Sequence, residues 1–310
     1  MKTVAILGEC MIELNGEPFG AMWQSYGGDT LNTATYLARL TSREQLSVRY
    51  VSAVGTDKLS AGMLARWQAD GLDTSWVLRD AHRQLGLYLI QLDAEGERTF
   101  LYWRNQSAAR YLLQHIDYPN ILSQLSNVDM IYLSGISLAI LPKNDRLLLL
   151  QQLAELAKQG VEIAFDSNYR ANLWQSIEET RQIYTALLPY VSLALVTFDD
   201  EQALWQDENS QATLQRLQSL GVKNIIVKQG KCGAIFQKFG EQPQLVPTKM
   251  VEKVVDSTSA GDAFNAGFLA GYLQGKDFVK CCQQGNEVAG VVIQHKGAII
   301  AADAMKHLHY

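Results

Sequence analysis

Short apolar segments alternate with helical patterns along the whole chain, and this alternation narrows the fold more than any other feature. Strands are predicted at residues 4–7, 49–54, 129–133, 161–165, 193–197 and 224–228. Helices are predicted near residues 30–40, 60–70, 145–159, 176–188, 210–220, 260–274 and 278–294. Buried strands that alternate with helices form parallel sheets covered on both sides. The sequence therefore predicts an α/β fold, a mostly parallel sheet flanked by helices on both faces.

Two stretches interrupt this alternation, near residues 11–26 and 85–104. In the second stretch, side chains alternate between two faces with a period of two residues, both before and after residues 93–96, which is typical of a hairpin. A register symmetric about Glu95 places Tyr88 opposite Tyr102, with Arg104 further along the same face. A small β-sheet outside a parallel core suggests a lid, so we expect a single domain over residues 1–310 that carries a lid.

Composition excludes several classes of function. The net charge of −5 argues against a nucleic-acid partner or an anionic membrane surface. No apolar run approaches the roughly 20 residues that span a bilayer. Residues 1–8 are predicted to be a first strand rather than a signal peptide. The four cysteines form no C-x-x-C motif, so we expect reduced thiols and a cytoplasmic location.

The segment DSTSAGDAF, residues 256–264, follows an apolar run, which we interpret as a strand, and leads into a helical pattern. The start of a helix leaves backbone N–H groups unpaired and favours an anion. Asp262 lies there, either as a helix cap or as a general base. The small residues Ala260 and Gly261 would let a phosphate approach the backbone, which a simple cap does not require. The segment therefore favours a phosphoryl transferase.

The same segment resembles the D-T-x-x-A-G-D signature of the ribokinase-like (PfkB) carbohydrate kinases, with Ser257 at the usual Thr. A second signature, residues 27–34, has two glycines before an Asn and a helix. The resemblance covers essentially the whole chain and implies that Asp262 deprotonates the attacking hydroxyl. It assigns an anion hole to Ser259, Ala260 and Gly261. It assigns sugar contacts to Gly28, Asp29, Thr30, Leu31 and Asn32, although residues 27–32 also suit a loop that enters and caps a helix.

Aromatic and arginine residues follow two predicted strands and resemble one subgroup of this family, the 2-keto-3-deoxygluconate kinases. In that subgroup such residues hold an acidic sugar, and the resemblance implies a ribokinase-like fold and transfer of the ATP γ-phosphoryl group to the sugar 6-hydroxyl. The matching substrate-binding residues are Tyr88, Tyr102, Trp103, Arg104 and Arg170. Two arginines suit a carboxylate, because guanidinium pairs with it in bidentate fashion. The alternative for either arginine is a surface salt bridge.

The resemblance also implies a nucleotide site. Its expected residues are Asn168, Tyr169, Arg170, Lys228, Gly230, Gly233, Ser259, Ala260, Gly261 and Asn286. The glycines also suit a purely structural hairpin turn, and Arg170 could contact ATP phosphates instead of the sugar. The resemblance implies that Asp200 or Glu201 organises Mg²⁺ through water, although either could instead be an ordinary carboxylate in the first turn of the following helix. A K⁺ ion is expected near Asp256, Thr258 and Gly297, although Gly297 could simply end a helix.

Three functions remain open from the sequence. The first is a sugar-acid kinase that uses ATP and Mg²⁺. The second is another ribokinase-like kinase that acts on fructose, ribose or a nucleoside, and the third is a non-catalytic sugar-binding relative. The arginines speak against the second and an intact Asp262 against the third. Exposed strand edges and the apolar Leu87 and Leu101 predict at least a dimer, formed through the lid.

Overall fold

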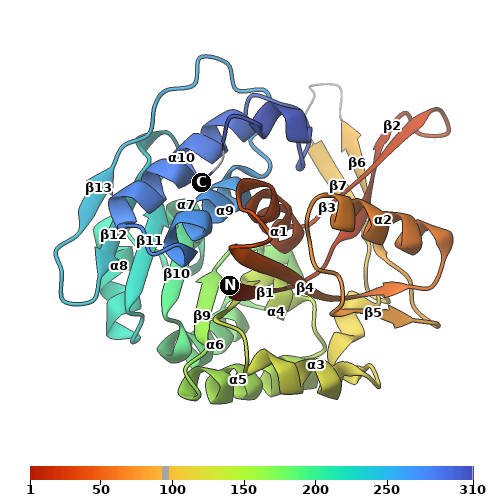
Figure 1. Ribbon diagram of the computed structural model, residues 1–310, viewed down its shortest axis with the longest axis horizontal. Coiled ribbons are helices and arrows are strands. Elements are labelled where there is room, and N and C mark those ends of the chain that lie inside the picture. Colours follow the sequence, from red (N-terminus) through yellow and green to blue (C-terminus); the bar gives the residue numbers. More distant parts are fainter. Residues whose placement is uncertain (93–97, 309) are drawn as a thin grey trace.

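The computed structural model describes residues 1–92, 98–308 and 310. Within this part of the chain, nine strands form one sheet in the order β13-β12-β11-β10-β9-β8-β1-β4-β5 (Figure 1). Their bounds are β1 Lys2–Leu7, β4 Leu46–Gly55, β5 Val77–Asp80, β8 Met130–Ser134, β9 Glu162–Asp166, β10 Leu193–Thr197, β11 Asn224–Lys228, β12 Ala234–Lys238 and β13 Gln244–Val246. The pairs from β11 to β5 are parallel, and β12 and β13 extend the sheet antiparallel. The predicted mostly parallel sheet is confirmed.

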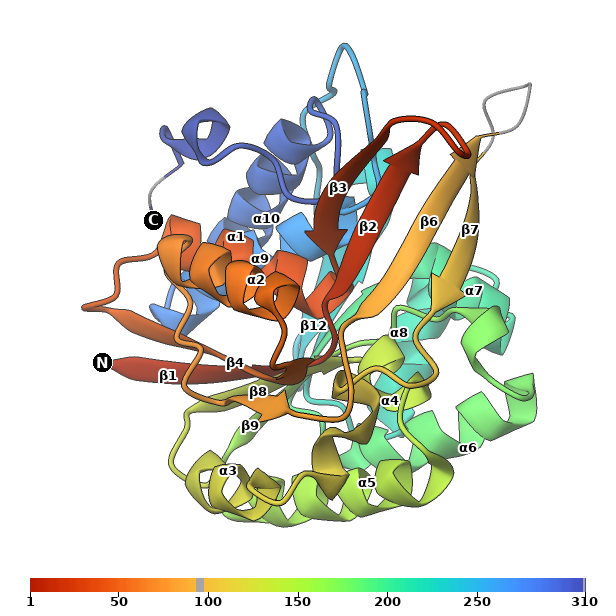
Figure 2. The ribbon, with the colours of Figure 1, turned by 90° about the vertical axis from the view of Figure 1, so that its right-hand side faces the viewer.

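Helices cover both faces of this sheet (Figure 2). One face carries α1 (Asp29–Leu40), α2 (Lys58–Ala69), α9 (Ala260–Leu273) and α10 (Phe278–Val292). The other carries α3 (Tyr118–Leu125), α4 (Gly135–Ala139), α5 (Lys143–Lys158), α6 (Ile177–Leu187), α7 (Phe198–Trp205) and α8 (Ser210–Ser219). Alternate side chains of β1 enter two separate cores, Val4 and Ile6 on the first face and Ala5 and Leu7 on the second. A strand buried on both faces needs such a continuous apolar run.

A second, four-stranded sheet stands away from the first in the order β3-β2-β6-β7 (Figure 2). Its strands are β2 Met11–Gly16, β3 Met22–Gly27, β6 Gly86–Leu92 and β7 Arg98–Trp103. Tyr88 pairs with Tyr102, which confirms the predicted register, while Glu95 and the rest of the predicted turn lie outside the described residues. Because side chains alternate along a strand, Tyr88 and Tyr102 share the face opposite to Leu87 and Leu101.

The six predicted core strands and seven predicted helices are all present, within a few residues at their ends. The sequence patterns missed β5 and β13, which form the two edges of the large sheet, and β12, which pairs with β13. The apolar run before Asp256, interpreted as a strand, is an irregular loop instead. The free cysteines Cys10, Cys281 and Cys282 are buried and Cys232 is exposed. Among the described residues, no helix combines the length and apolar character needed to cross a membrane.

Candidate active site

The functional candidates gather where the parallel strands end, which is where open α/β sheets bind ligands. Two cavities meet there, at the N-terminal turn of α9. One, of about 590 Å³, lies between α10 and the turn that joins β11 to β12. The other, of about 440 Å³, lies beneath the small sheet. Asp262, Asn168, Arg170 and Thr258 line both cavities, so the two cavities adjoin at these residues.

Asp262 lies in the first turn of α9, and its carboxylate accepts a hydrogen bond of 2.8 Å from Asn32 Nδ2. The N-cap of this helix is Ser259, so capping does not explain Asp262. Burial, followed by the nearby Asp29 carboxylate, raises the pKa of Asp262 to about 8, against the lowering effect of the Asn32 hydrogen bond. A carboxyl with this pKa can take up a proton near neutral pH, as a general base must.

The small residues before Asp262 open the helix terminus to the larger cavity. Ala260 and Gly261 line that cavity, and a Cβ placed on Gly261 would lie 3.4 Å from the Lys228 ammonium nitrogen. Ser259 is buried and its hydroxyl donates to the carbonyl of Ala298 at 2.7 Å, away from the cavity. Of the expected anion hole, Ser259 could therefore contribute its backbone N–H but not its side chain.

Helix α1 presents only one of its faces to the smaller cavity. Gly28, Asp29 and Asn32 line the cavity, because residues three apart share a face of a helix. Thr30 turns away and shares a hydrogen bond of 3.1 Å with the hydroxyl of Tyr50. Leu31 is fully buried in the core. The structure thus brings together three of these five expected sugar contacts and turns the side chains of Thr30 and Leu31 elsewhere.

Aromatic side chains of the small sheet cover the other side of this cavity. Tyr88 and Tyr102 lie there with ring centroids 5.9 Å apart, next to Phe100, which the sequence analysis did not single out. The Tyr88 hydroxyl donates to Glu13 on β2, and burial raises the pKa of Tyr88. Trp103 lies on the opposite face of β7 and is 58% exposed. Because neighbouring side chains of a strand point to opposite faces, Trp103 points away from the smaller cavity and is not placed to contact a sugar there.

The two arginines occupy different environments. Arg104 lines the smaller cavity, where its Nε and Nη2 both donate to Glu9, at 2.9 Å for Nε. Glu9 is buried after β1 and also accepts a hydrogen bond from Ser107. Arg170 is half exposed and its Nη1 lies 3.1 Å from Asp200 Oδ1. Glu9 was missed by the sequence analysis, although a carboxylate two residues after the end of a core strand is a recognisable signal.

The segment after β9 places its residues on different sides. Asn168, at a φ of 31°, donates from Nδ2 to Asp29 at 2.8 Å and lines both cavities. Tyr169, expected near the nucleotide, is instead buried in the core beneath the sheet. Its neighbours Asn168 and Arg170 line the cavities, so the chain alternates here between site and core.

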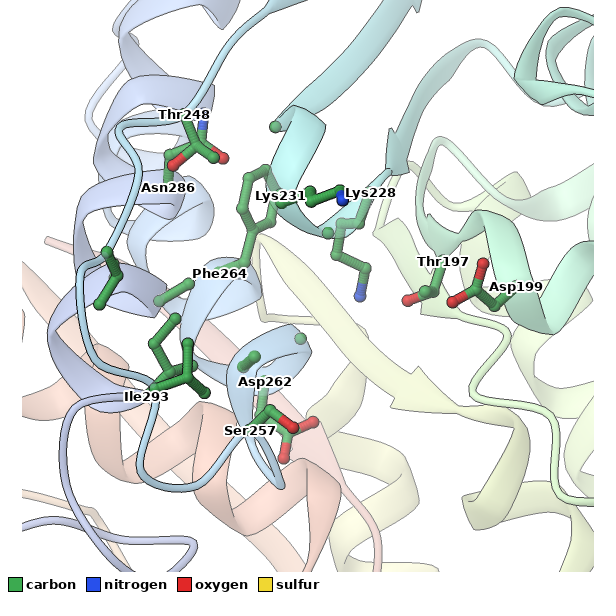
Figure 3. Close-up of a pocket in the computed structure, with 18 of the residues that line it drawn as sticks. Thr197, Asp199, Lys228, Lys231, Thr248, Ser257, Asp262, Phe264, Asn286 and Ile293 are labelled. Atoms are coloured by element: carbon green, nitrogen blue, oxygen red, sulfur yellow. The ribbon is translucent and has the colours of Figure 1, made fainter.

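The larger cavity has one polar and one apolar wall (Figure 3). The first wall is formed by Lys228, the last residue of β11, and by Gly230 and Gly233 in the turn to β12. A Cβ on Gly233, which has a φ of +93°, would meet the Val246 carbonyl at 2.2 Å, so the turn needs glycine. The structural and the nucleotide interpretations of these glycines are thus compatible. The apolar wall contains Val251, Phe264, Ala289 and Ile293.

Asn286 of α10, one of the expected nucleotide residues, also lines this larger cavity. Its amide donates to the carbonyls of Val246 at 3.3 Å and Pro247 at 3.4 Å. In the structure it therefore holds the segment after β13 against α10. A cavity with an apolar wall, a few polar groups and a helix terminus suits a nucleotide with its phosphates.

A family pattern described as pfkB family carbohydrate kinase matches residues 1–305. The chain belongs to this family. It is therefore an enzyme, a carbohydrate kinase, and the non-catalytic alternative is overturned.

Relatives and solved structures agree with this membership. The kinase is 63% identical over 310 residues to the 2-dehydro-3-deoxygluconokinase of Haemophilus influenzae, covering 99% of this chain and 98% of that one. It is 45% identical over 307 residues to the Dickeya dadantii protein of the same name, covering 98% of both chains. A putative ribokinase II of Escherichia coli in complex with ATP and Mg²⁺ has a TM-score of 0.82 at 23% identity, over 96% of this chain and 95% of that one. Such a structural likeness confirms the ribokinase-like fold.

The acidic residues after β10 separate into two environments in this kinase. Asp199 and Asp200 line the larger cavity, and burial raises the pKa of Asp200. Glu201 is 1% exposed and pairs with Arg216 at 2.6 Å, below the surface of the site. Asp200 is therefore the better placed of the two expected magnesium residues. In the part of the chain that the structure describes, no group of three or more His, Cys, Asp or Glu side chains could hold a metal ion.

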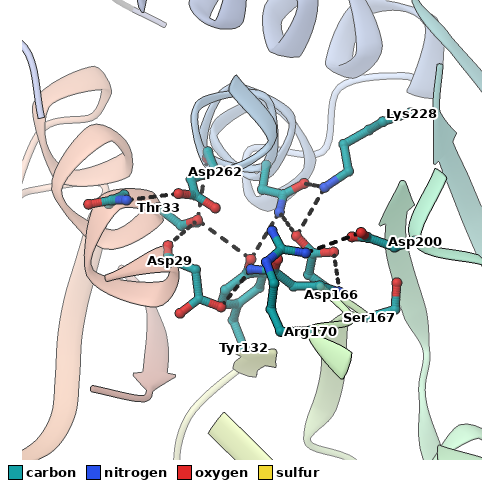
Figure 4. A network of polar contacts seen from close by, with 12 residues as sticks. Asp29, Thr33, Tyr132, Asp166, Ser167, Arg170, Asp200, Lys228 and Asp262 are labelled. Carbon is teal, nitrogen blue, oxygen red and sulfur yellow. Dashed lines mark hydrogen bonds and ion pairs between the residues drawn. The ribbon is translucent and has the colours of Figure 1, made fainter. Parts of the chain in front are cut away.

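A buried polar network crosses the base of the site (Figure 4). Asp166, at the end of β9, accepts hydrogen bonds of 3.0 Å from Lys228 and 2.7 Å from Asn265 Nδ2. Asn265 Nδ2 also donates to the Tyr132 hydroxyl at 2.9 Å. The sequence analysis missed Asp166, Asn265 and Tyr132, because no local pattern separates them from ordinary strand and helix residues.

The residues expected near K⁺ also lie together. The Asp256 carboxylate accepts hydrogen bonds from the backbone N–H groups of Thr258 at 3.1 Å and Gly297 at 3.1 Å. Gly297 has a φ of +93°. Asp256 thus ties the loop before α9 to the turn after α10.

Proposed function

We propose that this kinase transfers the γ-phosphoryl group of ATP to the 6-hydroxyl of 2-dehydro-3-deoxygluconate, with Asp262 as general base. The observation that carries this proposal is the meeting of the two cavities at Asp262. The smaller cavity offers hydrogen-bonding groups and two arginines, which suits an acidic sugar. The larger offers an apolar wall and a helix N-terminus, which suits ATP. The name shared by the similar relatives supports the same substrate.

The proposed step needs a proton acceptor, a place for the phosphoryl group and an exclusion of water. The Asp262 carboxylate takes the hydroxyl proton, and Asn32 orients that carboxylate. The backbone N–H groups at the start of α9 would receive the charge of the phosphoryl oxygens. The aromatic cover of Tyr88 and Tyr102 would shield the sugar from water.

The alternative is a kinase for a neutral ketose, a pentose or a nucleoside. ATP consumption should be measured by coupled assay with 2-dehydro-3-deoxygluconate, fructose, ribose and adenosine in parallel. We expect rapid turnover of the sugar acid alone. Faster turnover of any neutral compound would overturn the assignment of the substrate. NMR of the product would identify the phosphorylated hydroxyl.

Magnesium would be held mainly by the ATP phosphates and water, with Asp200 as a nearby carboxylate, and it would neutralise phosphate charge. We expect activity to vanish in excess chelator and to return when Mg²⁺ is added. Asp200→Asn should raise the Mg²⁺ concentration that gives half-maximal activity. Glu201→Gln is the matched control and should lower the melting temperature without changing that concentration. Activity that persists in chelator would contradict a metal requirement.

A monovalent cation is proposed near Asp256, where two loops of the site meet. K⁺ should then stimulate turnover relative to tetramethylammonium at equal ionic strength, and Asp256→Asn should abolish the stimulation. Equal rates in the two salts would remove K⁺ from the mechanism.

The outer face of the small sheet is proposed to bind a second copy of the chain. Leu101 and Trp103 are 43% and 58% exposed on this face, and Leu87 is half-buried there. We expect light scattering to give at least a dimer, and Leu101→Glu to shift it toward a monomer. Leu245→Glu is the control, because Leu245 is 57% exposed on the distant β13. A wild-type monomer at working concentration would refute the proposal.

A further inference from the structure

Lys228 is a buried cation at the end of β11, with its side chain 7% exposed. Its ammonium donates to Asp166 Oδ2 at 3.0 Å and to Asn265 Oδ1 at 3.0 Å (Figure 4). Burying an ammonium is costly unless it is paired and hydrogen-bonded. Asp166 and Asn265 meet that need and also hold the ammonium at one position.

This ammonium faces the cavity beside the helix terminus. Figure 3 shows the Lys228 side chain extending from β11 toward the turn that carries Asp262. A Cβ on Gly261 would lie 3.4 Å from the nitrogen, so the ammonium stands next to the first turn of α9. An ammonium has three N–H donors, and the bonds to Asp166 and Asn265 use two of them.

Several carboxylates surround the place where the two cavities adjoin, so a cation is needed there if an anionic group is to bind. Asp29, Asp166 and Asp262 lie around the meeting point of the cavities, and the first two raise the pKa of Asp262 while Lys228 lowers it. A phosphoryl group that enters here is itself anionic and would be repelled by these carboxylates. Arg170 is half exposed and paired with Asp200, and Arg104 is held by Glu9 in the smaller cavity, whereas the Lys228 ammonium is held in place beside the start of α9.

We propose that Lys228 is a catalytic residue that binds the γ-phosphoryl group during its transfer, and that Asp166 and Asn265 are its positioning residues. The proposal rests on the proposed function for the direction of transfer. In the step, the sugar hydroxyl gives its proton to Asp262 and its oxygen forms a bond to the γ-phosphorus. The bond from that phosphorus to the β–γ bridging oxygen breaks, and its electron pair leaves with ADP. Lys228 stays protonated throughout.

The test is Lys228→Met, which keeps the length of the side chain and removes its charge. We expect the kcat to fall ~10²–10³-fold, as for the loss of one preorganised donor to a transition state. The KM for the sugar acid should change little. By titration calorimetry, ATP should lose ~10- to 100-fold more affinity than ADP, because only ATP carries the γ-phosphoryl group. Lys223→Met is the control, since Lys223 is exposed just before the other end of β11.

A purely structural Lys228 makes different predictions. Removing both charges in Lys228→Met/Asp166→Asn would then restore folding and turnover together. A catalytic Lys228 predicts that this double variant folds but stays slow. Equal losses of ATP and ADP affinity, or a near-normal kcat at saturation, would overturn the proposal. The comparison of ATP and ADP affinities is made without sugar, so its result does not depend on whether the sugar-acid assignment is correct.

Discussion

Asp262→Asn should fold and bind both substrates, yet turn over ~10²–10⁴-fold more slowly, the usual effect of losing a positioned base. The fold should survive because the amide oxygen of the introduced side chain can still accept the hydrogen bond that Asn32 donates at 2.8 Å to Asp262. Steady-state kinetics would show the loss in kcat, and calorimetry would show sugar binding retained. Near-normal turnover of Asp262→Asn would remove Asp262 from the role.

The raised pKa of Asp262 adds a pH dependence to this prediction. A base must be deprotonated, so kcat/KM of the wild type should fall as the pH drops below about 8, the pKa that burial and Asp29 give to Asp262. Between the unfolded pKa of about 4 and the folded pKa, the folded protein binds the extra proton, so stability falls as the pH rises. Asp262→Asn should therefore have the higher melting temperature, by a margin that grows toward pH 8. A margin that is independent of pH would contradict the assigned pKa.

Arg170→Ala should impair the sugar acid much more than any side activity on a neutral ketose. Losing one partner of a desolvated charge pair costs ~2–5 kcal/mol, roughly 30-fold to several-thousand-fold in affinity or efficiency. Arg170 is half exposed and paired with Asp200, so we expect the lower part of that range. Arg170→Lys should recover only part of the loss, because an ammonium cannot form the bidentate pair. The sugar KM should rise while the ATP KM stays, whereas a phosphate contact predicts the reverse.

Arg104 needs a different experimental design. Glu9 is buried against it, so Arg104→Ala alone would leave an uncompensated buried carboxylate and destabilise the fold. The double variant Glu9→Gln/Arg104→Ala removes both charges, and Glu9→Gln by itself is the matched control. The double variant should lose the sugar acid selectively, with a melting temperature close to that of the control. Equal losses on acid and neutral sugars in the Arg170 and Arg104 variants would overturn the carboxylate assignment.

Much of the architecture follows from local patterns. Short apolar segments of strand length alternate with helical patterns, which is typical of a parallel sheet, because helices on both faces of such a sheet bury its strands. The alternation across residues 85–104 determined the register of Tyr88 and Tyr102, since a slip of one residue would turn every side chain to the wrong face. Asp262 could be found because small residues before a helix have a local chemical meaning.

Only the tertiary structure decided which side chains meet. The Asn32–Asp262 bond joins residues 230 positions apart, and Asp166 meets Asn265 across 99. No local pattern encodes such partners, so the pairing of Asp166 with Lys228 and of Glu9 with Arg104 could not be predicted from the sequence. The orientation of β7 and α1 turned the side chains of Trp103 and Leu31 away from the smaller cavity, and the buried ion pair with Arg216 separated Glu201 from Asp200. Sequence determines periodicity and backbone chemistry, whereas burial and pairing depend on which elements pack together.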